Sequence, residues 1–87
     1  MKITKKDVAE KILSYLKHDI SIDDLVHWAE NALMEGEFEE ENFEIINDIV
    51  SRIGLADVKA FGLMWEDCEK YLNMLGYNVK VDIESAV

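Results

Sequence analysis

Clustered glutamates are the residues of this sequence whose type and spacing are best suited to metal binding or catalysis. Residues 35 to 44 read EGEFEEENFE and place six glutamates around Phe38 and Phe43. Such a cluster could bind a divalent cation or serve in acid–base catalysis. A calcium-binding loop, however, interleaves Asp, Asn and Gly at fixed positions, and this stretch does not. We therefore expect diffuse, weak cation binding here and no specific metal site.

The two histidines add little further metal chemistry. Asp24 and His27 have the carboxylate-x-x-histidine spacing of helical metal sites, but such sites need two of these pairs and further carboxylates. His18 supplies no second pair. Asp23 lies four residues before His27, a spacing that predicts a surface ion pair of little energetic value. We predict no metal ligand, cofactor or catalytic residue at these positions.

The single cysteine, Cys68, has the residue type of a nucleophile but not the surroundings of one. It falls in the first turn of a predicted helix, where the helix dipole favours a thiolate. Three neighbouring acids oppose ionisation, and Cys68 shares an apolar stripe with Leu72 and Leu75. Free cysteine often behaves as a small hydrophobic residue. We therefore predict a buried structural thiol, and we expect that the protein is not an enzyme.

Two capping patterns in the amino-terminal part of the chain predict where helices begin. Thr4 and Ser21 are each followed three residues later by an aspartate, Asp7 or Asp24, with apolar residues on both sides. This pattern predicts a capping box, in which the hydroxyl accepts from one backbone amide and the acid accepts from another. Apolar residues then recur at helical spacing. The predicted helices, roughly 4-17 and 21-35, have a short connection and should form an antiparallel pair.

Two further helices and a strand are predicted in the remaining chain. The helices, about 42-53 and 65-75, each end at a glycine. The tail then changes period, because apolar and polar residues alternate over 77-83, which predicts a half-buried strand. The only internal candidate for its partner is 57-63, which could equally be a short helix. In that case the tail must pack alone or pair with another chain. The predicted fold class is mainly α, a compact bundle of about four helices with a short C-terminal β-strand.

Apolar stripes at helical spacing predict which side chains face the core. We expect Phe38 and Phe43 to pack inward as well, because two exposed phenylalanines in so charged a stretch would lower solubility. Glu37 and residues 39 to 41 should point to water and contribute little to folding. The predicted stripes contain Val8, Ala9, Ile12, Leu13, Tyr15 and Leu16; Ile22, Leu25, Val26, Ala29, Ala32 and Leu33; Phe43, Ile46, Ile49, Val50 and Ile53; and Trp65, Cys68, Tyr71, Leu72 and Leu75.

The net charge is concentrated in one third of the chain. Residues 1 to 20 carry five lysines and three acids, +2, and residues 49 to 87 carry four basic and six acidic residues, −2. Residues 21 to 48 carry ten acids and no Lys or Arg, which accounts for the net charge of −10. Such a surface disfavours nucleic acid and favours a basic protein partner. The alternative is that it only keeps a small protein soluble.

Size and composition indicate one globular domain, residues 1-87. A chain of this length buries roughly 60 to 65% of its unfolded surface, which is enough for a modest core. Its apolar residues do not form one long run, so we expect no membrane span. The amino terminus lacks the apolar run of an export signal, and a single cysteine fits a reducing compartment. We expect a cytoplasmic location.

These features predict a noncatalytic protein-binding module that uses an acidic face, residues 21-48. Its most concrete form is an immunity- or inhibitor-type protein for a basic toxin or nuclease. One alternative is a small structural domain that forms homodimers through the tail strand, and another is a carboxylate-based enzyme or metal site. We expect no cofactor, and neither nucleic acid nor a membrane as a partner.

An apolar spot within the acidic face would suit a protein interface. Met34 falls on the outer side of its predicted helix and Trp28 at the edge of the apolar stripe, although a tryptophan at an edge is more often part of the core. The predicted partner-binding residues are Asp23, His27, Trp28, Glu30, Met34, Glu35, Glu37, Glu39, Glu40, Glu41 and Glu44.

Overall fold

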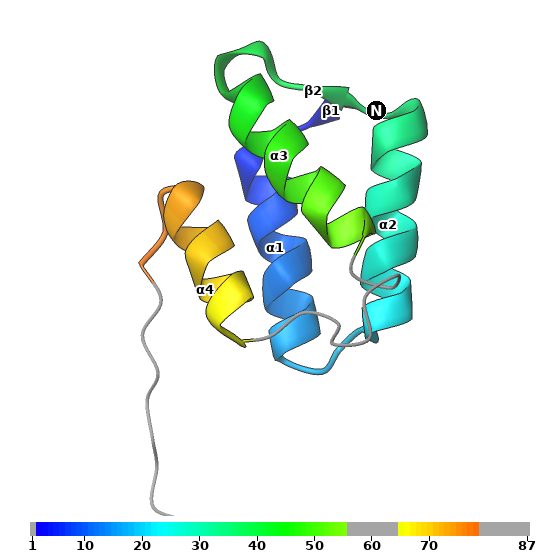
Figure 1. The fold of residues 1–87 in the computed structure, drawn as a ribbon, viewed down its shortest axis with the longest axis vertical. Helices are drawn as coiled ribbons and strands as arrows, with labels where there is room; N and C mark the ends of the chain where they lie inside the picture. Colours follow the sequence, from blue (N-terminus) through cyan, green and yellow to red (C-terminus); the bar gives the residue numbers. More distant parts are fainter. Residues whose placement is uncertain (1, 56–64, 79–87) are drawn as a thin grey trace, which may run out of the picture.

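Four α-helices make up most of the chain that the computed structural model describes, residues 2–55 and 65–78 (Figure 1). A short strand and one 3-10 turn connect the second helix to the third, and another short strand precedes the first helix. This architecture confirms the prediction of a mainly α bundle with a small β element. The elements in chain order are β1 (Lys2–Ile3), α1 (Lys5–Leu16), α2 (Ile22–Glu35), β2 (Glu37–Phe38), η1 (Glu40–Asn42), α3 (Phe43–Gly54) and α4 (Trp65–Met74).

Both predicted capping boxes are present at the starts of α1 and α2. The Thr4 hydroxyl accepts from the Asp7 N–H at 3.2 Å, and the Asp7 carboxylate accepts from the Thr4 N–H at 2.9 Å. Ser21 and Asp24 make the same exchange at 3.1 Å in each direction. Each box satisfies two backbone amides that the helix itself leaves free. The two helices therefore begin where the sequence predicts.

The ends of α1 and α4 share one backbone geometry, the Schellman motif. In each, one residue adopts a left-handed conformation, and the next N–H donates at 2.9 Å to the carbonyl five residues earlier. At the end of α4 this residue is Gly76, with φ 95°. At the end of α1 it is His18, with φ 65°, a conformation that glycine adopts more readily. The geometry at His18 turns the chain from α1 into α2.

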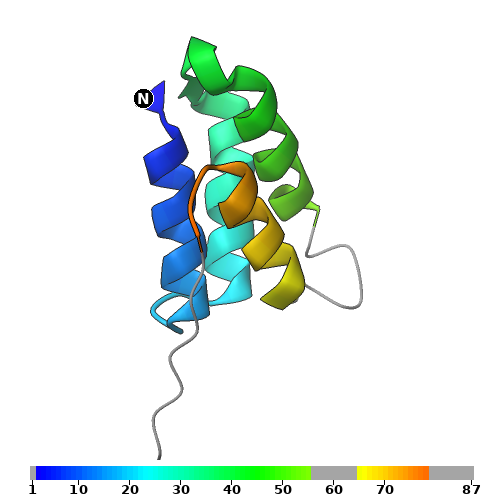
Figure 2. The same ribbon diagram turned by 90° about the vertical axis from the view of Figure 1, so that its left-hand side faces the viewer.

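The core lies where the helices meet. The most extensive helix contact is between α2 and α3, and α4 packs against α1. In the view of Figure 2, α4 lies in front, between α1 and α3. Most members of the predicted stripes are buried. The buried apolar side chains are Ile3, Val8, Ala9, Ile12, Leu25, Val26, Ala29, Ala32, Ile46, Ile49, Val50, Ile53, Cys68, Tyr71, Leu72 and Leu75.

Four predicted core positions are instead exposed to solvent. Their exposed fractions are 41% for Leu13, 42% for Leu33, 50% for Phe43 and 42% for Trp65. Phe43 and Trp65 are the first residues of their helices, and Leu33 lies in the last turn of α2. Side chains in terminal turns extend past the neighbouring helices, so periodicity overestimates their burial. Leu13 lies at the margin of the α1 stripe.

Strands β1 and β2 form a parallel pair that the sequence did not predict. Ile3 lies opposite Phe38, and Lys2 lies opposite Glu37. Each strand has only two residues, which is too short for an alternating pattern to be recognised. The pair brings the amino terminus of the chain beside the segment that joins α2 to α3 (Figure 1).

The predicted tail strand falls mostly outside the described residues. Tyr77 and Asn78 are described and have no strand conformation. Residues 79 to 83, and the candidate partner 57-63, lie in the ranges that the structure does not describe. The C-terminal strand therefore stays a prediction.

Candidate protein-interaction surface

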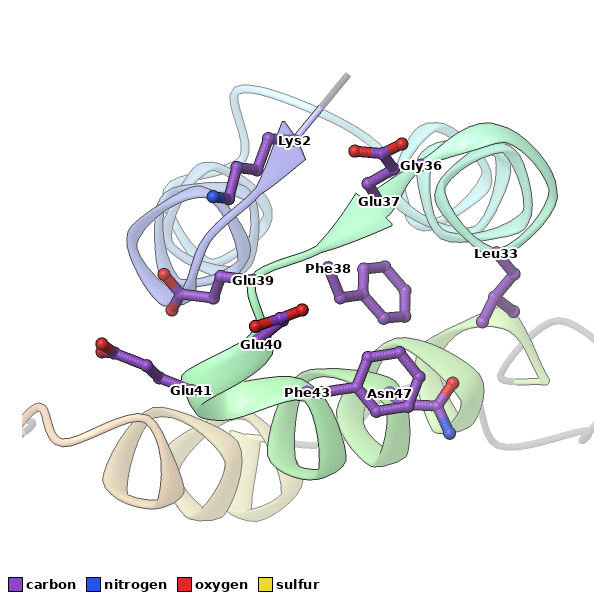
Figure 3. A pocket seen from close by; sticks show the side chains of 10 residues that line it. All are labelled: Lys2, Leu33, Gly36, Glu37, Phe38, Glu39, Glu40, Glu41, Phe43 and Asn47. Atoms are coloured by element: carbon purple, nitrogen blue, oxygen red, sulfur yellow. The ribbon is translucent and has the colours of Figure 1, made fainter.

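An open groove of about 880 Å³ lies at one end of the bundle. The last turn of α2, β2, η1 and the first turns of α3 form its walls, and Lys2 of β1 reaches its edge (Figure 3). Four of its residues are glutamates and one is a lysine, so the groove carries more negative than positive charge. Its lining residues are Lys2, Leu33, Gly36, Glu37, Phe38, Glu39, Glu40, Glu41, Phe43 and Asn47.

Phe38 and Phe43 form the apolar part of the groove together with Leu33. The ring centroids of the two phenylalanines are 5.8 Å apart and their planes are tilted by 49°, a favourable aromatic geometry. Phe38 is half-buried against the core, as predicted. The prediction that Phe43 packs inward is wrong, because α3 begins at this residue and its ring lies at the end of the bundle, on Phe38. Half of the Phe43 side chain thus faces solvent within an acidic surround.

Gly36 allows β2 to leave α2 at close range. Its backbone is extended, with φ −82° and ψ 153°, so the position does not need glycine for its dihedral angles. It needs glycine for space, because a Cβ atom there would lie 2.6 Å from the Ala32 carbonyl oxygen and 2.6 Å from the Ile3 Cδ1. Glycine thereby lets the strand that carries Phe38 pair with β1.

Glu39 is the exception among the acidic residues of the groove. Its Oε1 accepts from the Lys5 N–H at 3.2 Å and from the Asn42 side-chain amide at 2.8 Å. Its own N–H donates to the Ile3 carbonyl at 3.1 Å. The prediction that Glu39 points to water and contributes little to folding is therefore wrong. It caps the start of α1 from 34 residues away, a contact with no local signal in the sequence.

The remaining acids of residues 21 to 48 divide into two groups. Asp24 belongs to its capping box, and the Asp48 carboxylate accepts from Arg52 Nε at 3.1 Å. Seven others are exposed, and within the described residues they have no hydrogen bond or ion pair. These seven are Asp23, Glu30, Glu35, Glu37, Glu40, Glu41 and Glu44. They are spread over α2, β2, η1 and α3, and from here on we use the name acidic face for these seven residues.

The other predicted interface residues are not brought together as expected. His27 is exposed but makes no ion pair with Asp23, so the predicted pair does not form. Met34 is 81% exposed on the outer side of α2. Trp28 is half-buried and lines a separate groove of about 500 Å³ beside α1. Trp28 and Met34 thus do not line a common groove, whereas Leu33, Phe38 and Phe43 line one together.

Cys68 lies in the core, as predicted, with 0% of its surface exposed. Burial, and secondarily the charge of Asp67, raises the pKa of the Cys68 thiol to about 11. The thiol therefore keeps its proton at neutral pH, and the thiolate is the reactive form of cysteine. Cys68 is a packing residue of α4.

Metal-binding and membrane-spanning features are not found in the described parts of the chain. Across residues 2–55 and 65–78, no three side chains of His, Cys, Asp or Glu gather as a group that could hold a metal ion. No helix within the same ranges is both long and apolar enough to cross a membrane. A scan against protein-family models and searches among curated proteins and solved structures find no match to this chain.

Proposed function

We propose that this protein is a noncatalytic binding module that uses its acidic face to bind a basic protein. The observation that carries the proposal is the set of seven exposed carboxylates that have no partner among the described residues. Three of them, those of Glu37, Glu40 and Glu41, line a groove that also exposes apolar side chains. Three other carboxylates of the same segment, those of Asp24, Glu39 and Asp48, have structural partners. For the other seven, the described residues provide no internal contact that explains their presence.

Electrostatics favour a positively charged protein as the partner. Uncompensated carboxylates repel each other, and a basic surface brought against them would relieve this repulsion. Their combined field would also steer a basic partner and raise its association rate, most strongly at low ionic strength. Phosphate backbones are repelled by the same field, which disfavours nucleic acid.

The most concrete version of the proposal is an immunity- or inhibitor-type role in the cytoplasm. A toxin or nuclease that acts on nucleic acid needs a positive binding site, because that site must attract phosphates. A small acidic protein could occupy such a site and block it without performing chemistry. Size, charge and the exposed groove support this version, and a neighbouring reading frame that encodes a basic toxin would favour it further.

Affinity capture from the native cell tests the proposal. The bait is the full chain, in three forms: wild type, the triple variant Glu37→Gln, Glu40→Gln and Glu41→Gln, and a control variant Glu10→Gln, Asp19→Asn and Glu66→Gln. Both variants lose three negative charges, so each has a net charge of −7 instead of −10. We expect wild type and control to retain the same basic protein at about 0.05 M salt and to release it at about 0.5 M. Equal retention by the triple variant would contradict the proposal.

A further inference from the structure

The groove combines two kinds of surface that a single peptide segment could satisfy together. Its apolar part consists of Leu33, Phe38 and Phe43, and its lining also includes the carboxylates of Glu37, Glu40 and Glu41 (Figure 3). We infer that the groove binds a segment of the basic partner in which one bulky apolar side chain is flanked by Lys or Arg. This inference rests on the proposed function, and it adds the chemistry of the segment that docks.

The apolar part of the groove has surface available for a ligand side chain. Phe43 is 50% exposed and Leu33 is 42% exposed, although both are large apolar residues in a charged setting. An apolar patch rimmed by polar residues is typical of protein–protein interaction sites. The two phenylalanine rings form one continuous aromatic surface, because their centroids are 5.8 Å apart. An inserted aliphatic or aromatic side chain would bury this surface from water.

The acidic residues of the lining determine what must flank the apolar side chain. Glu37, Glu40 and Glu41 are exposed and have no partner among the described residues. Within the same described part of the chain, Lys2 is the only basic residue that lines the groove. Charge complementarity therefore selects Lys or Arg on either side of the apolar anchor. A second copy of this chain is a poor occupant, because it would bring like charges together. Phosphate-bearing ligands are disfavoured for the same reason.

The walls of the groove are already held in place without a ligand. Phe38 lies in β2, which pairs with β1, and Glu39 is fixed by the amide of Lys5 and the side chain of Asn42. Gly36 fixes the close approach of β2 to α2. A preformed site requires less ordering on binding than a flexible one, so more of the contact energy contributes to affinity.

Two synthetic peptides test the inference directly. Each has two lysines on either side of a central residue, which is leucine in one peptide and serine in the other. The probe is an NMR titration of the isotope-labelled full chain, which reports both the affinity and the residues affected. We expect the leucine peptide to bind roughly three- to tenfold tighter, the gain that corresponds to burying about half of a leucine side chain. The protein signals that shift when the leucine peptide is added should include those of Phe38 and Phe43.

Variants of the groove complete the test. Phe43→Ser should remove the preference for leucine and leave the affinity for the serine peptide within about twofold, because the charges are unchanged. Leu33→Ser serves the same purpose if Phe43→Ser does not fold. Met34→Ser is the matched control, since Met34 is exposed on α2 but does not line the groove; it should keep the preference.

The possible outcomes separate this inference from the proposed function. Equal affinity of wild type for the two peptides would overturn the inference and leave the acidic-face proposal standing. An unchanged preference in both groove variants would also overturn it. Failure of both peptides to bind at low salt would contradict the acidic-face proposal, and the inference with it.

Discussion

The joint, residues 35 to 44, and the outer face of α2 are both acidic in sequence, but among the described residues only the joint has a carboxylate that bonds a distant segment of the chain. In the joint, Glu39 accepts from the backbone of α1 and from Asn42, so it holds two segments of the chain together. On the outer face of α2, Asp23 and Glu30 are exposed and have no partner among the described residues. Composition therefore shows where charge lies, whereas hydrogen-bond partners show which carboxylates hold the fold and which are free to bind another molecule.

Replacing Gly36 at the start of the joint should have the largest effect on stability. The new methyl group of Gly36→Ala would lie 2.6 Å from the Ala32 carbonyl oxygen and from the Ile3 side chain, so the backbone must shift. We expect a loss of about 1–3 kcal/mol in the free energy of unfolding, measured by urea denaturation. Gly54→Ala is the control, because its nearest neighbour would be 3.5 Å away. Equal effects of the two substitutions would contradict this account of the joint.

Removing the Glu39 carboxylate should have the next largest effect. Glu39→Ala leaves the Lys5 N–H without its acceptor and breaks the bond from Asn42, and we expect it to destabilise the fold by about 1–2 kcal/mol. The matched variant is Glu40→Ala, whose carboxylate is exposed and unpaired in the described structure. Its effect should stay within about 0.5 kcal/mol. Equal melting temperatures of the two variants would mean that the Glu39 carboxylate stabilises the fold no more than the exposed carboxylate of Glu40.

Cys68 lies outside both acidic regions, and its replacement shows what effect a residue with a purely structural role should have. Cys68→Ala should reduce stability by about 1–2 kcal/mol through lost packing and leave partner binding intact. The folded thiol, with a pKa of about 11, keeps its proton at a pH where an unfolded thiol with the ordinary value of 9.0 loses it. The free energy of unfolding is therefore unaffected by this thiol below pH 9, and it falls between pH 9 and about 11, where only the unfolded thiol loses its proton.

Stability measured across that pH window tests the assignment of Cys68. Wild type should lose more stability than Cys68→Ala between pH 9 and about 11. Parallel pH profiles would mean that the thiol is not shielded as described. A folded Cys68→Ala protein that cannot bind a partner would show that Cys68 has a functional role.

Neutralising free carboxylates should have the smallest effect on stability. In the triple variant Glu37→Gln, Glu40→Gln and Glu41→Gln, repulsion is reduced, but Glu40 and Glu41 also lose a favourable interaction with the positive start of η1 and α3. Each effect is on the order of a few tenths of a kcal/mol, and they oppose one another. Thermal melting should therefore show a Tm that is unchanged or slightly raised. A clear loss of stability would mean that these glutamates hold the fold as Glu39 does.

Local signals in the sequence predicted much of the fold. The hydroxyl and acid of each capping box lie three residues apart, so Thr4 with Asp7 and Ser21 with Asp24 could be recognised without tertiary information. Helical periodicity predicted most of the core residues, because the spacing of apolar residues within one helix is also local information. The burial of Cys68 followed from its place on the apolar stripe of α4.

Contacts between distant segments could not be predicted in this way. The cap of Glu39 on the Lys5 amide joins residues 34 apart, and it exists only because β1 pairs with β2. The exposure of Phe43 depends on where α3 begins relative to its neighbours, which periodicity does not describe. The groove was therefore not predicted, although the sequence located the acidic residues that surround it.

The central claim, that the acidic face binds a basic protein, is tested most directly by the rate of association. Stopped-flow mixing of the captured partner with wild type, the triple variant and the charge-matched control should be repeated over a range of salt concentrations. We predict that the triple variant associates more slowly than wild type and control at low salt, and that the three rates converge as salt screens the field over roughly 10 Å at about 0.1 M. Identical association rates at low salt would contradict the claim.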